Sequence, residues 1–210
     1  MTEMSMNKAI HGAFRRDLTR FISALKAFPS GDRARAQQLQ TAWDNFDDQL
    51  THHHHGEHTI AWPALESIGM SKELLNTMDA EHETMAEALS TGRAAMSTLS
   101  RTASAADAQA ALAAMETLQR VAVQHLDHEE SEFEEFYLSN RETPEMKAMG
   151  KAFGKVSPAR GGRFFAWVLD GASADERATV AREVPGPVLT IIGGVFGRGY
   201  RKNVAPVWKA

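Results

Sequence analysis

The sequence predicts an all-α protein, an up-down-up-down four-helix bundle with an additional C-terminal helical or loop segment. Three observations support this class. Apolar residues recur in alternating steps of three and four, which is the spacing of one helix face. Several segments begin with capping residues and stop at Gly or Pro. No stretch alternates between polar and apolar residues as a strand does. We expect the bundle in residues 1–140, and the extension packed on it in residues 141–210.

Four segments in order carry an inward seam, and breaks at Pro29-Ser30-Gly31 and Ile68-Gly69 separate the first three. The seam residues, segment by segment, are His11, Phe14, Leu18, Phe21 and Leu25; Ala36, Leu39, Trp43, Phe46, Leu50, His53, Glu57 and Ile60; Leu75, Met78, His82, Met85, Leu89, Gly92, Met96 and Leu99; and Ala111, Met115, Leu118, Ala122, His125, Glu129 and then Phe133 or Phe136.

Capping residues mark further helix starts, some with Pro at the first helical position or an acidic residue three positions later. The predicted caps are Ser71, Ser104, Thr143, Ser157 and Ser173, and the predicted breaks in the C-terminal part are Arg160-Gly-Gly-Arg163 and Pro185-Gly186-Pro187.

Ionisable residues occupy seam positions where apolar residues are expected. Counting from the predicted turns places them at one level of the antiparallel bundle, to within about one helical turn. Burying them without partners would cost several kcal/mol each, and a bound metal satisfies them together. The predicted metal ligands are His11, His53, Glu57, His82, His125 and Glu129.

The spacing of these residues also favours a particular metal. His53 and Glu57 are four residues apart, as are His125 and Glu129, so each pair shares a helix face. Imidazoles suit iron, zinc, copper or nickel, and carboxylates can bridge two cations. Four nitrogens and two carboxylates suit two iron ions with positions left for O₂, peroxide, NO or water. The sequence has no Glu-x-x-His motif, which argues against a ferritin-type centre.

Four motifs in order contain these predicted ligands. They are His11, His53-His-His-Gly-Glu57 followed by Ala61-Trp62-Pro63, Glu81-His82 and His125-Leu-Asp-His-Glu129-Glu130. Through these motifs the chain resembles the hemerythrin family, in its HHE cation-binding branch, over roughly residues 7–137. The resemblance implies a non-haem di-iron centre with an oxo or hydroxo bridge, in which Glu57 and Glu129 bridge the irons.

Two departures separate this chain from the oxygen-carrying hemerythrins. Ala86 stands where those proteins have a second histidine on the third helix, and His125-x₃-Glu129 replaces their His-x₄-Asp pair. Both departures fit the HHE branch and leave one nitrogen fewer on the centre. We therefore expect turnover of peroxide, sensing or iron handling instead of reversible O₂ carriage.

The remaining histidines have simpler interpretations. His54 pairs with His58 one position off the seam, so we prefer His53 as ligand and keep His54 as a candidate extra ligand. We expect His52 and His55 on a solvated face, and His58 and His128 outside the ligand set. Trp62 is expected to be a packing anchor where the helix bends or ends before Pro63.

The composition limits the partners and the compartment. A net charge of -4 gives no sign of nucleic-acid binding. The absence of cysteine excludes thiolate metal sites, and neither a signal peptide nor a membrane-spanning stretch is visible, so we expect a cytoplasmic protein. The apolar pieces at residues 164–169 and 188–196 are expected to cover the bundle, a substrate channel or a homodimer face.

Three functions remain open at this level. The first is an enzyme with catalase-like or ferroxidase-like activity toward H₂O₂ or ferrous iron. The second is a module that senses or stores O₂, NO or iron without turnover. The third is a bundle with structural zinc or no metal. We favour a di-iron protein that reacts with small oxidants, and no catalytic side chain is identified apart from the metal ligands.

Overall fold

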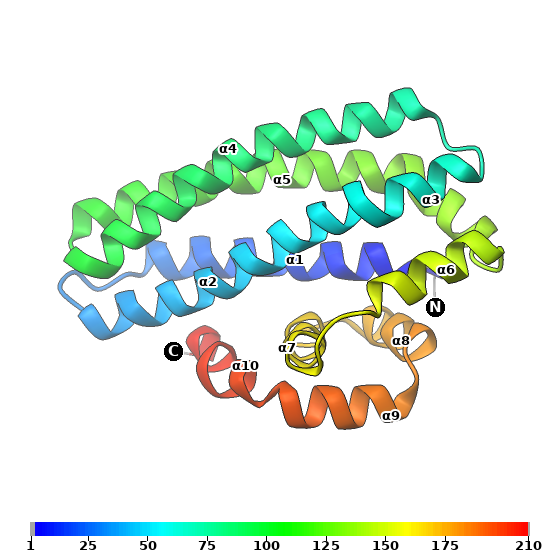
Figure 1. Ribbon diagram of the computed structural model, residues 1–210. Coiled ribbons are helices and arrows are strands. Elements are labelled where there is room, and N and C mark those ends of the chain that lie inside the picture. The colour runs from blue at the N-terminus through cyan, green and yellow to red at the C-terminus, as the bar shows by residue number, and fades with distance from the viewer. Residues whose placement is uncertain (1–2, 210) are drawn as a thin grey trace.

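The computed structural model describes residues 3–209, and every regular element in that range is a helix (Figure 1). The all-α prediction is therefore confirmed. Four long helical segments lie side by side and are joined by short turns. They are α1 (Met6–Lys26), α2 (Arg33–Gly56) with its continuations η1 (Glu57–Ala61) and α3 (Trp62–Ser67), α4 (Lys72–Thr102) and α5 (Ala105–Asn140).

Side-chain caps explain where several helices begin. The Ser71 hydroxyl accepts a hydrogen bond from the Leu74 N–H at 3.4 Å, and the Ser104 hydroxyl accepts one from the Asp107 N–H at 3.0 Å. Such caps satisfy N–H groups that have no partner within the helix. The other three predicted caps, Thr143, Ser157 and Ser173, also bond to their helices.

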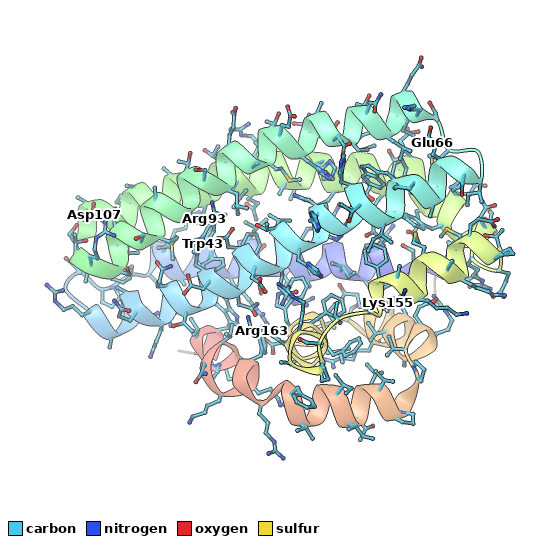
Figure 2. All side chains as sticks on the ribbon, in the orientation of Figure 1. Trp43, Glu66, Arg93, Asp107, Lys155 and Arg163 are labelled. Atoms are coloured by element: carbon cyan, nitrogen blue, oxygen red, sulfur yellow. The ribbon has the colours of Figure 1, made fainter. Side chains whose placement is uncertain are left out.

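The apolar core lies between the four long segments. Trp43 is fully buried among them, whereas charged side chains such as Glu66 and Asp107 project outward (Figure 2). The predicted apolar seam is buried along all four segments with one exception, Ile60. At the end of α5 the buried residue is Phe133, and Phe136 is only partly buried.

The exception has a local cause. From Glu57 to Ala61 the chain forms a turn of π-helix, which is wider than an α-turn and adds a residue to the repeat. Ala61, 1% exposed, therefore takes the inward position predicted for Ile60. Pro63 has no N–H to donate to the preceding turn. The helix widens before Pro63 and then continues to Ser67, so it does not end at Trp62.

Shorter helices form the C-terminal part and lie along one side of the four segments (Figure 1). α7 and α8 contact α1, α6 contacts α3, and α10 contacts α2. Trp167, Val180 and Val207 enter the main core. The elements are α6 (Pro144–Phe153), α7 (Pro158–Val168), α8 (Ala174–Glu183), α9 (Gly186–Val188), η2 (Leu189–Phe196), α10 (Arg198–Asn203) and η3 (Ala205–Lys209).

The predicted break at Arg160-Gly-Gly-Arg163 is wrong, because this stretch lies inside α7. A Cβ atom added to Gly162 would lie 2.4 Å from the Phe196 Cβ and 2.6 Å from the Ile192 carbonyl oxygen. The glycine therefore allows η2 to pack closely on α7, and it does not stop the helix. The predicted break at Pro185-Gly186-Pro187 does separate α8 from α9.

A buried polar contact joins the C-terminal part to α1. The Asp17 carboxylate, 1% exposed, accepts hydrogen bonds from the Trp167 indole at 2.8 Å and from the Arg20 guanidinium at 3.1 Å. Arg20 also donates to Asp170, which accepts a further bond from the Tyr200 hydroxyl at 3.1 Å.

Within residues 3–209 no helix has both the length and the apolar character required to cross a bilayer.

Candidate metal centre

Seven side chains from the four long segments converge at one level of the molecule. In each of two groups, the nitrogen and oxygen atoms that could bind a metal lie within 4.8 Å of one another. We call the group of four the first half-site and the group of three the second half-site. The first half-site contains His11, His53, Glu57 and Glu129, and the second contains His54, His82 and His125.

The first half-site combines two imidazoles with two carboxylates. His11 Nε2 lies 3.2 Å from Glu129 Oε2, and His53 Nε2 lies 3.1 Å from Glu57 Oε1. The side chains of His11 and Glu129 have no exposed surface. A mixed nitrogen and oxygen donor set of this kind suits iron or zinc.

The second half-site consists of imidazoles alone. His82 Nε2 lies 3.1 Å from His125 Nε2, and the rings of His54 and His82 stack with their centroids 4.1 Å apart. The three rings come from α2, α4 and α5. Trp62 lies parallel to the His82 ring with a centroid separation of 6.0 Å and covers this side of the centre.

Glu57 reaches both half-sites. One of its oxygens, Oε1, lies near His53, and the other, Oε2, lies 3.4 Å from His82 Nε2. Glu129 Oε2 lies 3.2 Å from His11 Nε2 and 3.8 Å from His125 Nε2. The second Glu129 oxygen accepts a hydrogen bond from the Asn7 amide at 2.9 Å. The two carboxylates therefore lie between the half-sites, and each lies close to histidines of both.

Buried atoms without hydrogen-bond partners gather at this centre. Buried polar atoms are almost always paired, and an unpaired one costs roughly 1–3 kcal/mol. The contacts between imidazole and carboxylate above lack hydrogen-bond geometry, as expected for atoms directed at a common third point. Within residues 3–209 the unpartnered atoms include His11 Nε2, His53 Nε2, His54 Nε2, both Glu57 oxygens and Glu129 Oε2. These residues therefore fit a pair of cations.

The electrostatics of the site agree with this fit. Burial, reinforced by the surrounding histidines, lowers the pKa of His53 and of His54 well below the ordinary value. Burial and the neighbouring His125 lower the pKa of His82 to about 4. Burial and the nearby Glu129 carboxylate raise the pKa of Glu57 well above its usual range. Neutral imidazoles offer free lone pairs, and a cation would relieve the cost of the buried Glu57 charge.

Acidic side chains orient the imidazoles from outside the centre. His11 Nδ1 lies 3.1 Å from Glu130 Oε1, and His125 Nδ1 lies 2.8 Å from Glu81 Oε2. Such carboxylate–histidine contacts fix the ring and leave the other nitrogen free for a metal. Sequence reasoning did not assign these partners, although Glu81 and Glu130 stand next to predicted ligands. Asn7 was missed as well, because a lone asparagine one turn before His11 carries no signal of its own.

The structure brings together all six predicted ligands and the candidate His54. His53 faces His11 on α1, and His54 faces His82 on α4, so the two neighbours on α2 contribute to different half-sites. The centre therefore gathers five imidazoles, one more than the four preferred from the seam. His54 supplies the fifth, on a different helix from the histidine that Ala86 replaces.

The other histidines lie outside the two groups. His52 and His55 are exposed, as expected. His58 Nδ1 contacts Asp79 at 2.9 Å, and His128 Nδ1 contacts Glu81 at 2.7 Å. These two imidazoles therefore touch acidic residues around the centre without reaching it.

Comparison with known proteins identifies the four long segments. The family model described as the hemerythrin HHE cation binding domain matches residues 5–137, which contain all seven side chains. No curated protein and no solved structure gave a significant match. Since the family model covers more than half of the chain, this protein belongs to the hemerythrin HHE cation-binding family.

Proposed function

We propose that this chain is a non-haem di-iron protein that reacts with small oxidants, above all hydrogen peroxide. The observation that carries the proposal is the set of buried, unpartnered nitrogen and oxygen atoms in two adjacent groups that share Glu57. We take the four long segments as an up-down-up-down bundle, with the ligands at one level inside it. Two iron ions bound there would supply the redox chemistry for disproportionation, in which one H₂O₂ is reduced to water and a second is oxidised to O₂.

The residues of this chain would hold and orient these ions. His11 and His53 would hold the first, His54, His82 and His125 the second, and Glu57 and Glu129 would bridge them. Five imidazoles and two carboxylates do not fill two octahedral coordination shells when the carboxylates are shared. Exchangeable positions would remain for an oxidant.

Hydrogen bonds from outside the site would orient the ligands, and burial would shield some of them from water. Glu81 and Glu130 would keep His125 and His11 in the tautomer that presents Nε2 to the metal, and Asn7 would hold Glu129. Glu129 has no exposed surface and His125 is 1% exposed, so these two ligands on α5 are shielded from water. Such shielding strengthens the electrostatic interactions that they make.

The test is to purify the chain without added metal and to measure its metal content and H₂O₂ consumption. We expect about two irons per chain and consumption of H₂O₂ with O₂ release in the stoichiometry of disproportionation. A His55→Ala variant, altered at an exposed histidine beside the ligands, should behave as the unaltered chain does. Two bound irons without turnover would favour sensing or storage, and bound zinc or no metal would overturn the di-iron proposal.

A further inference from the structure

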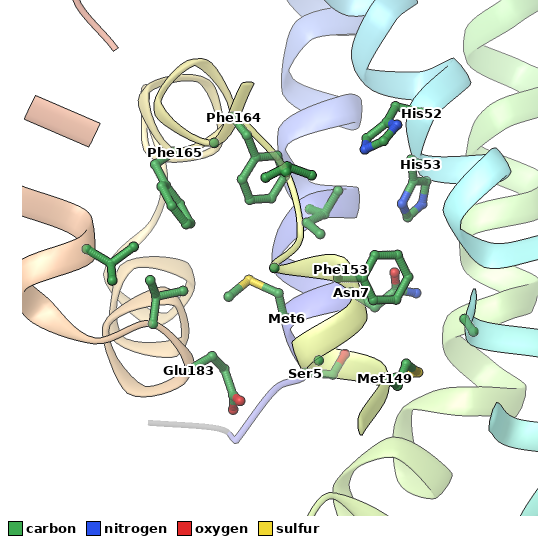
Figure 3. A pocket seen from close by; sticks show the side chains of 18 of the residues that line it. Ser5, Met6, Asn7, His52, His53, Met149, Phe153, Phe164, Phe165 and Glu183 are labelled. Carbon is green, nitrogen blue, oxygen red and sulfur yellow. The ribbon is translucent and has the colours of Figure 1, made fainter. Parts of the chain in front are cut away.

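A cavity of about 700 Å³ lies between the long helices and the C-terminal helices. Its lining comes from α1, α2, η1 and the end of α5, and from α6, α7, η2 and the α8–α9 region of the C-terminal part (Figure 3). Pockets for organic ligands typically measure roughly 300–1,000 Å³. Much of this wall lies beyond residue 137, where the family match ends, so the cavity is a feature of this chain's own C-terminal part.

The cavity wall is mainly apolar. Six large apolar side chains are exposed within residues 3–209, and three of them line this cavity: Phe153 at 38%, Val156 at 37% and Val188 at 37%. Met6 and Phe164 lie across from one another in the same space (Figure 3). Apolar side chains left uncovered within one concave space indicate an apolar ligand.

The inner end of the cavity reaches the first half-site. His53 and Glu57 both line it, whereas no residue of the second half-site is among the described residues that do. Gly56, between these two ligands, allows the Phe153 ring to approach the helix. A Cβ atom at that position would lie 2.6 Å from Phe153 Cε1. A molecule in the cavity would therefore meet the metal centre on the His53 and Glu57 side.

One buried polar group faces this space without a partner. Gln49 lines the cavity, is 4% exposed, and has no hydrogen-bond partner for its Nε2 within residues 3–209. It lies one helical turn before His53, on the same face of α2. An amide N–H donor so placed requires an acceptor oxygen.

Apart from Glu57, the charged residues among the described lining are already paired. Arg160 donates to Asp48 at 2.8 Å, Arg141 donates to Glu3, and Glu183 accepts from Arg182 at 3.1 Å. No lining cation is therefore free to neutralise a carboxylate or phosphate at the inner end, where Glu57 already lies. These charges favour an uncharged ligand.

We propose that this cavity binds an uncharged, mainly apolar organic molecule with one acceptor oxygen. The oxygen end accepts from Gln49 and faces His53 and Glu57, while the apolar body lies among Phe153, Phe164 and Met6. The inference deepens the proposed function, because it places such a molecule beside the proposed metal centre, on its His53 and Glu57 side. It rests on the proposed function for that placement only, since binding itself requires the cavity alone.

The test uses the full chain, as purified, and 1-decanol as the probe in isothermal titration calorimetry. We expect saturable binding of 1-decanol, and binding of decanoate and decyltrimethylammonium weaker by about tenfold or more, because a buried unpaired charge is costly. Gln49→Leu, which removes the donor and keeps the volume, should weaken 1-decanol binding about two- to tenfold. Met6→Trp, which fills the cavity, should abolish it.

A matched control and a second filling variant keep the test decisive. Ile191→Trp adds the same indole to a residue that is 58% exposed and does not line the cavity, and it should leave 1-decanol binding unchanged. If circular dichroism shows that Met6→Trp is unfolded, Val188→Trp fills the cavity from the opposite wall. The proposal would be overturned if the unaltered chain did not bind 1-decanol. It would also be overturned if both filling variants bound 1-decanol as tightly as the unaltered chain does.

Metal content and peroxide consumption measured on the same samples separate this inference from the proposed function. An iron-loaded, peroxide-consuming chain that fails to bind 1-decanol would refute the cavity proposal alone. A chain that binds 1-decanol with the expected variant pattern but holds no iron would refute the di-iron proposal and would leave the binding site standing.

Discussion

The two half-sites lie side by side but differ in donors and surroundings. The first combines His11 and His53 with both carboxylates, whereas the second offers three imidazoles and no carboxylate of its own. The first also meets the apolar cavity, whereas the second lies under Trp62. If each half-site holds a cation, as we propose, the second would anchor its ion and the first would expose its ion to incoming molecules.

Glu57 ties the two halves together, so its loss has the largest expected effect. Its two oxygens lie 3.1 Å from His53 Nε2 and 3.4 Å from His82 Nε2. In Glu57→Ala we expect both irons to be lost, because each half-site loses a ligand that the two share. Metal analysis of the purified variant measures this, and full retention of both irons would show that Glu57 does not bridge.

Loss of His54 should have the next largest effect on iron content, because it should empty one half-site and leave the other filled. His54 Nε2 belongs to the second half-site only, so His54→Ala should lower the iron content from about two to about one per chain. The exposed neighbour His55 provides the matched control, and His55→Ala should retain both. Loss of both irons from His54→Ala would show that the half-sites do not fill independently.

Removal of Glu81, the carboxylate outside the second half-site, should have a smaller effect on metal binding. Glu81 contacts His125 Nδ1 at 2.8 Å and fixes the ring that presents Nε2 to the centre. Removal of such a partner typically weakens metal binding about 10–100-fold. Competition with a chelator should show this loss in Glu81→Ala but not in Glu83→Ala, whose side chain is exposed. Equal affinities in the two variants would contradict the orienting role.

Removal of a buried carboxylate that lies away from the centre should have the smallest effect on iron content. Asp17 accepts from Trp167 and Arg20, so Asp17→Ala leaves a buried indole N–H without a partner. We expect the free energy of unfolding in urea to fall by about 1–3 kcal/mol, with the iron content unchanged. Loss of iron from this variant would mean that the contact between α1 and the C-terminal part supports the half-sites directly.

The seam was predictable because its spacing is a local property of each helix. Apolar residues at alternating steps of three and four must face a common core, and ligands on that seam follow them inward. The same reasoning misplaced Ile60, since a π-turn changes the repeat, and it left His54 as a secondary candidate. The seam spacing selects only one of the adjacent residues His53 and His54. In the structure each of them belongs to a different half-site.

The C-terminal part was less predictable because its contacts are between residues far apart in the sequence. Gly161 and Gly162 suggested a break, although Gly162 is required where η2 lies against α7. The cavity brings Met6 together with Phe153 and Val188, which no local pattern relates. The prediction that the apolar pieces here would cover the bundle, a substrate channel or a homodimer face did not say which residues they would contact.

The two half-sites are expected to hold one iron each. Native mass spectrometry of the chain purified without added metal tests this stoichiometry most directly, because it counts the ions on each molecule. We predict a main species with about two irons per chain. A main species with a single ion, or with zinc in place of iron, would contradict it.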